Sequence, residues 1–214
     1  MILKFIIAFV LGVILTVLLT ALGLHPVLSY FVIIFLILFI VLYLPLLLPA
    51  YVSRNEKTIE KYLLKNKDHP QLYLFYALGN RMGEDVDEII SELLKKHNNK
   101  HQKALYQTIL HFYNNDYKAA SETLNDIRPE KIKEYYKIGV EIELGSLKDA
   151  QAAIDRLKEG WVKSSLLAEL NNKKGDRSSA IRYANRALNE VRGLQWYLLY
   201  CEYKREYNIN AQSK

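Results

Sequence analysis

The sequence predicts an all-α protein in which two transmembrane helices precede an α-solenoid of helical hairpins. Three observations support this prediction. The first fifty or so residues are almost free of charge, the remainder is charged and interrupted at short intervals, and several interruptions recur every thirty residues. No long stretch alternates between apolar and polar residues with period two, so no β-sheet is expected.

Charge divides the chain into two unequal parts. Lys4 is the only charged residue before Arg54, whereas all 23 acidic residues and 28 of the 29 Lys and Arg residues follow Ser53. The charges of the second part are interspersed, and no block of Lys and Arg indicates nucleic-acid binding. We therefore expect a transmembrane hairpin at 1–52, a juxtamembrane helix and linker at 53–69, a helical repeat domain at 70–207 and a disordered tail at 208–214.

Two long apolar runs predict the membrane helices, at about residues 3–24 and 27–48. As a helix, the uninterrupted run of 20 residues from Phe5 to Leu24 would be about 30 Å long, which matches the hydrocarbon core of a bilayer. Lipid offers the backbone no hydrogen-bond partners, so each run should be helical. Because residues 21–23 also resemble a signal-peptide cleavage site, it stays open whether the first helix is retained or cleaved.

Basic residues after the second run predict its orientation. Lys57, Lys61 and Lys65 follow it, whereas the link between the two runs contains no Lys or Arg. The positive-inside rule therefore places the repeat domain in the cytoplasm, as part of a multi-pass protein of the cell membrane. At i, i+4 spacing the three lysines share one helix face, which could contact lipid headgroups. The alternative is a solvated face with Glu56 and Glu60 as local partners.

The first predicted helix carries a line of small residues, Ala8, Gly12, Thr16 and Thr20, which recur every four positions. They form one groove along a helix face, where another helix can approach closely. The bulky second helix could fill this groove within the hairpin. Alternatively, the groove could mediate self-association or contact with another membrane protein.

The helical part has a thirty-residue register. Its breaks at 115–116, 145–146 and 175–176 are thirty residues apart. Small residues follow these breaks at matched places, namely Ala120, Ala150 and Ala180. Large residues on the other helices recur with the same spacing, namely Tyr76, Tyr106, Tyr136, Leu166 and Trp196. A fixed period of this kind marks helical hairpins that complete one another's core.

This part of the chain resembles tetratricopeptide repeats. In the family's second helix a small residue is followed by apolar residues four and seven positions later, as Ala120 is by Leu124 and Ile127. The segments around Ala150 and Ala180 match in the same way, and the resemblance covers about residues 70–207. The period of thirty differs from the family's 34, and a regular proline is missing. The resemblance implies a right-handed superhelix whose concave face binds a peptide or a protein helix.

The sequence contains no motif that indicates catalysis. His97 and His101 are four residues apart, but the Asn-Asn-Lys stretch between them predicts a helix break, and no Cys or carboxylate stands at ligand spacing. The single cysteine, Cys201, is expected to be buried as a small apolar residue. We therefore expect neither an enzyme nor a cofactor or metal site.

These expectations combine into a predicted function. A membrane-spanning hairpin joined to a repeat domain indicates a membrane-anchored scaffold for protein–protein interaction, with the bilayer and an unidentified protein or peptide as partners and no nucleic acid. The alternative is a structural or assembly subunit of an integral membrane complex that contacts its partners through the transmembrane helices. Richness in Asn, Lys, Ile and Tyr suggests a bacterial source.

Overall fold

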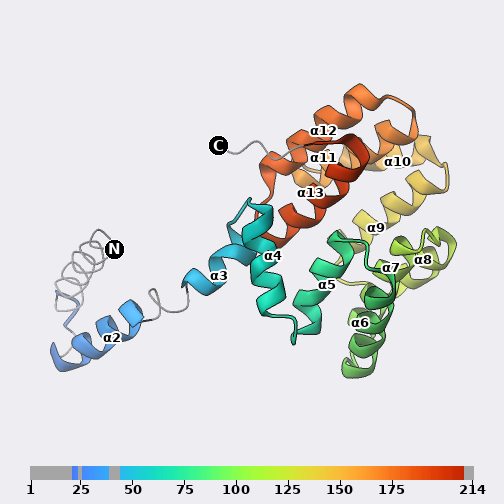
Figure 1. The fold of residues 1–214 in the computed structure, drawn as a ribbon. Coiled ribbons are helices and arrows are strands. Elements are labelled where there is room, and N and C mark those ends of the chain that lie inside the picture. Colours follow the sequence, from blue (N-terminus) through green and yellow to red (C-terminus); the bar gives the residue numbers. More distant parts are fainter. Residues whose placement is uncertain (1–20, 24–25, 39–43, 210–214) are drawn as a thin grey trace. The chain divides into compact units, whose positions relative to one another are not determined.

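The computed structural model describes residues 21–23, 26–38 and 44–209 (Figure 1). The chain divides into two compact units, Met1–Tyr51 and Val52–Lys214. Every regular element in the described ranges is a helix, and no residue in those ranges belongs to a strand. The all-α class predicted from the sequence is therefore confirmed.

The first unit contributes two described helices, α2 (Pro26–Leu38) and α3 (Leu44–Tyr51). Within the described ranges, no helix combines the length and the apolar character needed to cross a membrane. Most of the predicted helix at 3–24 lies outside these ranges, as do all four of its small residues, Ala8, Gly12, Thr16 and Thr20. Helix α3 runs past the predicted end at residue 48 and through Pro49.

The second unit is a succession of short helices separated at every break that the sequence predicts (Figure 1). Consecutive helices pack against each other. The helices are α4 (Glu56–Lys65), α5 (Pro70–Gly79), α6 (Gly83–Lys96), α7 (Lys100–Tyr113), α8 (Tyr117–Thr123) with the 3₁₀ turn η2 (Leu124–Asp126), α9 (Glu130–Glu143), α10 (Leu147–Arg156), α11 (Trp161–Lys173), α12 (Arg177–Glu190) and α13 (Gly193–Tyr207).

One type of turn closes the four hairpins α5–α6, α7–α8, α9–α10 and α11–α12. Each turn contains a residue in the left-handed region, with φ of 55° at Arg81, 58° at Asn115, 87° at Gly145 and 81° at Gly175. The N–H of the following residue bonds to a carbonyl five positions back, as from Ser146 to Glu141 at 2.8 Å. This pattern is the Schellman C-cap, which satisfies the last carbonyls of a helix. The four hairpins thus share one turn geometry.

The thirty-residue register does not extend to the first hairpin. Asn115, Gly145 and Gly175 are thirty residues apart, but Arg81 precedes Asn115 by 34. The difference is one helical turn, because α6 has 14 residues whereas α8 has 7 and continues only through a 3-residue 3₁₀ turn. Measured from the hairpin turn, Tyr76 is therefore equivalent to Leu110 and not to Tyr106.

Small residues bring the two helices of each later hairpin together. Ala120, Ala150 and Ala180 are completely buried, with 0% of their surface exposed. Among the larger residues of the predicted column, Leu166 and Trp196 are buried, and Tyr76, Tyr106 and Tyr136 are half-buried. Together with the partly buried side chains packed against them, the buried residues form clusters that are each shared by three or more helices, so neighbouring hairpins complete one another's core.

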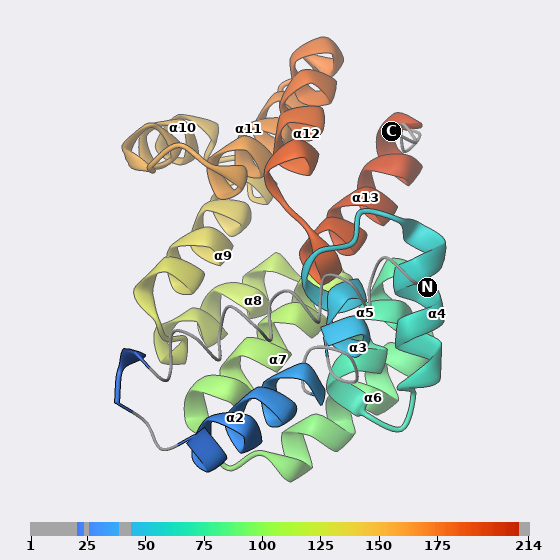
Figure 2. The same ribbon diagram turned by 90° about the vertical axis from the view of Figure 1, so that its left-hand side faces the viewer.

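The second unit closes on itself, because its last helix, α13, contacts α4 and α5. Fully buried Tyr197 of α13 accepts a hydrogen bond from Asn80 at 2.9 Å and donates one to Glu60 at 3.2 Å. The chain before α4 adds a backbone bond from the Gly193 N–H to the Ser53 carbonyl at 2.8 Å. Figure 2 shows α9 connecting the α7–α8 hairpin to the helices α10–α12. The array is thus a closed ring of helices.

Candidate functional site

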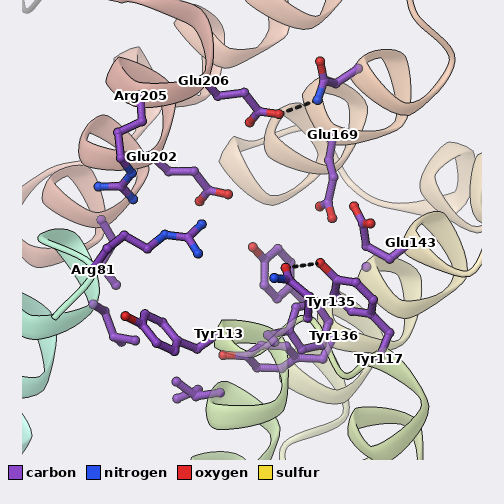
Figure 3. A pocket seen from close by; sticks show the side chains of 17 residues that line it. Arg81, Tyr113, Tyr117, Tyr135, Tyr136, Glu143, Glu169, Glu202, Arg205 and Glu206 are labelled. Carbon is purple, nitrogen blue, oxygen red and sulfur yellow. Dashed lines mark hydrogen bonds between the residues drawn. The ribbon is translucent and has the colours of Figure 1, made fainter. Parts of the chain in front are cut away.

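A cavity of about 620 Å³ lies inside the ring. Its volume is within the range of about 300–1,000 Å³ that is common for ligand sites. The lining comes from α5, α7, α9, α11 and α13, together with the turn after α5, the turn before α8 and the first residue of α8 (Figure 3). The lining residues are Leu78, Arg81, Ile109, Phe112, Tyr113, Asn115, Tyr117, Tyr135, Tyr136, Gly139, Glu143, Glu169, Asn172, Leu198, Glu202, Arg205 and Glu206.

One wall of the cavity is aromatic. Tyr136 of α9 packs edge to face against Tyr135 and against Phe112 of α7, and the ring centroids are 5.3 Å apart in both pairs. Gly139 makes room for this packing, since a Cβ there would stand 3.2 Å from the Phe112 ring. Burial raises the pKa of Tyr136 to about 12, so its hydroxyl stays protonated at neutral pH. The wall therefore presents uncharged ring faces and hydroxyl groups.

Glutamates from three helices occupy the other side of the cavity (Figure 3). Glu143 of α9 forms an ion pair with Lys173 at 2.7 Å, and Glu206 of α13 accepts a hydrogen bond from Asn172. No hydrogen bond or ion pair joins Glu169 of α11 or Glu202 of α13 to another residue in the described part of the chain. Two carboxylates thus face the cavity without a hydrogen bond or an ion pair in those ranges.

The carboxylates raise one another's pKa. Removal from bulk water and then the charge of Glu202 hold the pKa of Glu169 well above its usual value. Removal from water and the charge of Glu206 also raise the pKa of Glu202, although Arg81 and Arg205 oppose this. The pKa of Glu206 is raised chiefly by burial. The negative charge of the cavity is thus only partly compensated.

Two arginines also border the cavity. The Arg81 guanidinium lies over the Tyr113 ring at 5.7 Å, and Arg205 donates a hydrogen bond to the carbonyl oxygen of Gly79. The second contact connects α13 to α5, so Arg205 takes part in ring closure. The lining holds two guanidinium groups and four carboxylates, and Lys173 pairs with one of the carboxylates, Glu143, so a formal excess of one negative charge remains.

Of the residues selected from the sequence that lie within the described ranges, only Tyr136 lines the cavity. The periodic sequence patterns did not indicate the glutamates, although these residues occupy repeat positions. Ile109, Gly139 and Glu169, for example, stand at one position of three successive repeats, thirty residues apart. A position whose chemistry changes from one repeat to the next gives no periodic signal, and this is why sequence patterns did not find the site.

The three lysines of α4 lie away from the cavity and are exposed. Their predicted local partners point elsewhere. Glu56 forms an ion pair with Lys204 of α13 at 2.9 Å, and Glu60 accepts a hydrogen bond from Tyr197 of the same helix. The alternative in which the three lysines pair locally with Glu56 and Glu60 is therefore not the arrangement seen, because α13 engages both glutamates. The lysines concerned are Lys57, Lys61 and Lys65.

The two neighbouring histidines lie on either side of the break between α6 and α7. His97 is hydrogen-bonded to Gln71 at 3.0 Å, and the His101 Nδ1 accepts from the Arg128 N–H at 2.8 Å. Over residues 21–23, 26–38 and 44–209, no three His, Cys, Asp or Glu side chains converge as they would around a metal ion. Cys201 is buried, and burial raises the pKa of its thiol to about 11.

Comparison with known proteins gives no relative from which a function could be transferred: no family model, no curated protein and no solved structure matches the chain. Its function therefore has to be argued from the cavity and its lining. The arrangement of ring faces, paired and unpaired carboxylates and guanidinium groups can bind a polar, flexible chain by stacking, hydrogen bonds and charge.

Proposed function

We propose that this protein is a membrane-anchored protein-interaction module whose tetratricopeptide-like hairpins enclose a binding site for a segment of a partner protein. The cavity of about 620 Å³ inside the ring carries the proposal. Tyrosine and arginine side chains are enriched among the residues that dominate binding energy in protein interfaces, and both kinds line this cavity. Repeat arrays commonly bind through their concave face. The recurring Schellman turn supports the repeat relationship.

Exposed apolar side chains of the first unit support the membrane anchor. Tyr30, Phe31 and Ile34 of α2 are 60%, 69% and 55% exposed, and neither α2 nor α3 contains a charged residue. Water solvates such surfaces poorly, whereas the hydrocarbon core of a bilayer accommodates them. In this proposal the first unit is embedded in the cell membrane and the second unit lies at its cytoplasmic face.

The exposed lysines of α4 support a position close to the bilayer. Glu56 and Glu60 are engaged by α13, and the neighbouring face of α4 presents a basic surface made of Lys57, Lys61 and Lys65. Each lysine near an anionic membrane surface contributes about 1 kcal/mol. We propose that these side chains contact lipid headgroups.

Affinity capture from native membranes tests the proposal. The tagged full chain is compared with Leu198→Trp, which places a larger side chain in the cavity lining, and with Leu144→Trp, which makes the same change at an exposed site. We expect one protein to co-purify at constant stoichiometry with the wild type and with Leu144→Trp, and to be lost with Leu198→Trp. Retention of that protein by Leu198→Trp, or the absence of any reproducible protein, refutes the interaction-module proposal.

A fourth version of the chain tests the alternative function. Gly12→Leu fills the predicted small-residue groove of the first membrane helix and leaves the second unit unchanged. If this variant loses the co-purifying protein while Leu198→Trp keeps it, the protein is instead a structural or assembly subunit that binds through its membrane helices. Chains lacking residues 1–52 should then also fail to capture the partner.

A further inference from the structure

The cavity has a small side recess where its aromatic and acidic parts meet. This recess holds about 40 Å³ and is lined by Tyr135, Glu169 and Glu202 among others. Its volume exceeds the roughly 10–15 Å³ that one water molecule needs on this measure. It can therefore accommodate a compact polar group, whereas a bulky ring fits only in the main cavity.

The chemistry of the recess favours a positive charge. Glu169 and Glu202 come from different helices, α11 and α13, and neither has a hydrogen bond or ion pair with any residue the structure describes. Arg81 and Arg205 attract the Glu202 carboxylate without forming an ion pair with it. Tyrosine ring faces attract cations, and tyrosine hydroxyls can accept hydrogen bonds. Removal from water raises the pKa of both carboxyl groups and the neighbouring carboxylates raise it further, and a cation between them would oppose both effects.

We propose that the partner segment is basic and that one of its lysine side chains enters the recess, where the ammonium group donates hydrogen bonds to Glu169 and Glu202 beside Tyr135 (Figure 3). The inference rests on the proposed function and specifies the chemistry of the partner. An ammonium group is compact and has three donors, which suits two carboxylates and a hydroxyl. The rest of the segment lies in the main cavity, where carboxylates outnumber the cationic groups.

Two other cationic occupants fit the recess less well. A metal ion requires converging ligands, and no cluster of three possible ligands exists among the described residues. A free polyamine would supply the same ammonium group but would leave most of the cavity of about 620 Å³, including its aromatic wall, without contacts. A lysine carried by a polypeptide places its ammonium in the recess and its backbone along that wall.

Direct binding of defined peptide pools to the full chain in nanodiscs tests the inference. Fluorescein-labelled octapeptides carry lysine, norleucine, arginine or glutamate at two fixed positions and random residues elsewhere. Norleucine retains the alkyl chain of lysine without its ammonium group. Fluorescence anisotropy is measured with the wild type and with the double variant Glu169→Gln, Glu202→Gln. The matched control is Glu92→Gln, Glu122→Gln, which changes two exposed glutamates outside the cavity lining.

The inference predicts that the lysine pool binds the wild type at least about tenfold more tightly than the norleucine and glutamate pools. The double variant in the recess should abolish this preference while its thermal unfolding shows an intact fold, and the control variant should keep it. Equal binding of lysine and norleucine pools, or an unchanged preference in the recess variant, overturns the lysine assignment. Displacement of the lysine pool by free spermidine at equal concentration overturns the assignment to a polypeptide.

The Leu198→Trp variant separates a failure of this inference from a failure of the proposed function. If a neutral or acidic pool binds and Leu198→Trp abolishes its binding, the cavity remains a peptide site and only the lysine assignment is wrong. If no pool binds, or if Leu198→Trp leaves all binding unchanged, both the lysine assignment and the peptide site are refuted.

Discussion

Replacing Gly79 with alanine should strain the contact that closes the ring. Gly79 is the last residue of α5, and a Cβ at this position would stand 2.7 Å from the Cε1 atom of Tyr197 and 3.1 Å from its Cζ atom. Tyr197 has no exposed surface, and its hydroxyl is held by Asn80 and Glu60. The ring therefore cannot swing into solvent, and either α5 or α13 has to move.

The expected cost combines two opposing effects. Forcing an extra carbon into a packed core costs about 1–3 kcal/mol. Exchanging glycine for alanine within a helix recovers up to about 1 kcal/mol, and less at the last residue of the helix. We therefore expect Gly79→Ala to lower the free energy of unfolding by about 1–2 kcal/mol, which corresponds to a decrease in Tm of roughly 2–8 °C for a domain of this size.

Thermal unfolding of the full chain, followed by circular dichroism, measures this effect. Gly83→Ala is the matched control, because its Cβ would lie 3.9 Å from the Tyr113 hydroxyl oxygen, an ordinary contact distance. In a Tyr197→Leu background the additional cost of Gly79→Ala should largely disappear, because the obstructing ring is gone. The argument for closure is wrong if Gly79→Ala unfolds at or above the Tm of the wild type, or if its cost is the same in both backgrounds.

Three further predictions concern stability. Folding raises the pKa of Glu169 above its usual value of about 4.5, so the stability that this group contributes is present below that value and is lost as the pH rises towards the folded pKa. Glu169→Gln should therefore raise the Tm at pH 8, by an amount worth about 1.4 kcal/mol per unit of the pKa difference, and should give no gain at pH 4. Thermal melts between pH 4 and pH 8 measure both effects. Ala150→Leu should lower the free energy of unfolding, measured by chemical denaturation, by about 1–3 kcal/mol or more, because Ala150 is completely buried. The same change at exposed Ala152 should be nearly neutral. Similar losses at both sites would contradict the packing described for the second helices. Lys204→Gln should cost less than about 1 kcal/mol, since its ion pair with Glu56 is partly exposed, and a loss that persists undiminished at high salt would rule out an ionic origin.

Local chemistry explains why the helices of the second unit could be predicted from the sequence. The side chain of Asp116 accepts a hydrogen bond from the Ala119 N–H at 3.1 Å, and Asp176 accepts one from the Ser179 N–H at 3.0 Å. Such caps act within a single turn, so the residues that end and begin helices can be read directly from the chain. The fully buried alanines follow from a spacing that the sequence also displays. No periodic pattern in the sequence indicates the recess beside Glu169 and Glu202, because neighbouring repeats carry different residues at its positions.

By itself, the sequence determined the all-α class, the positions of the breaks and the thirty-residue recurrence of the later hairpins, since each depends on residues close together in the chain. Only the tertiary structure decided that the array closes into a ring. The closing bonds from Tyr197 to Glu60 and from Lys204 to Glu56 join residues 137 and 148 positions apart. In a repeat array the curvature is the sum of small rotations between successive hairpins, so no single residue encodes closure. The cavity, with its unpaired carboxylates, exists only because that sum brings α13 back to α5.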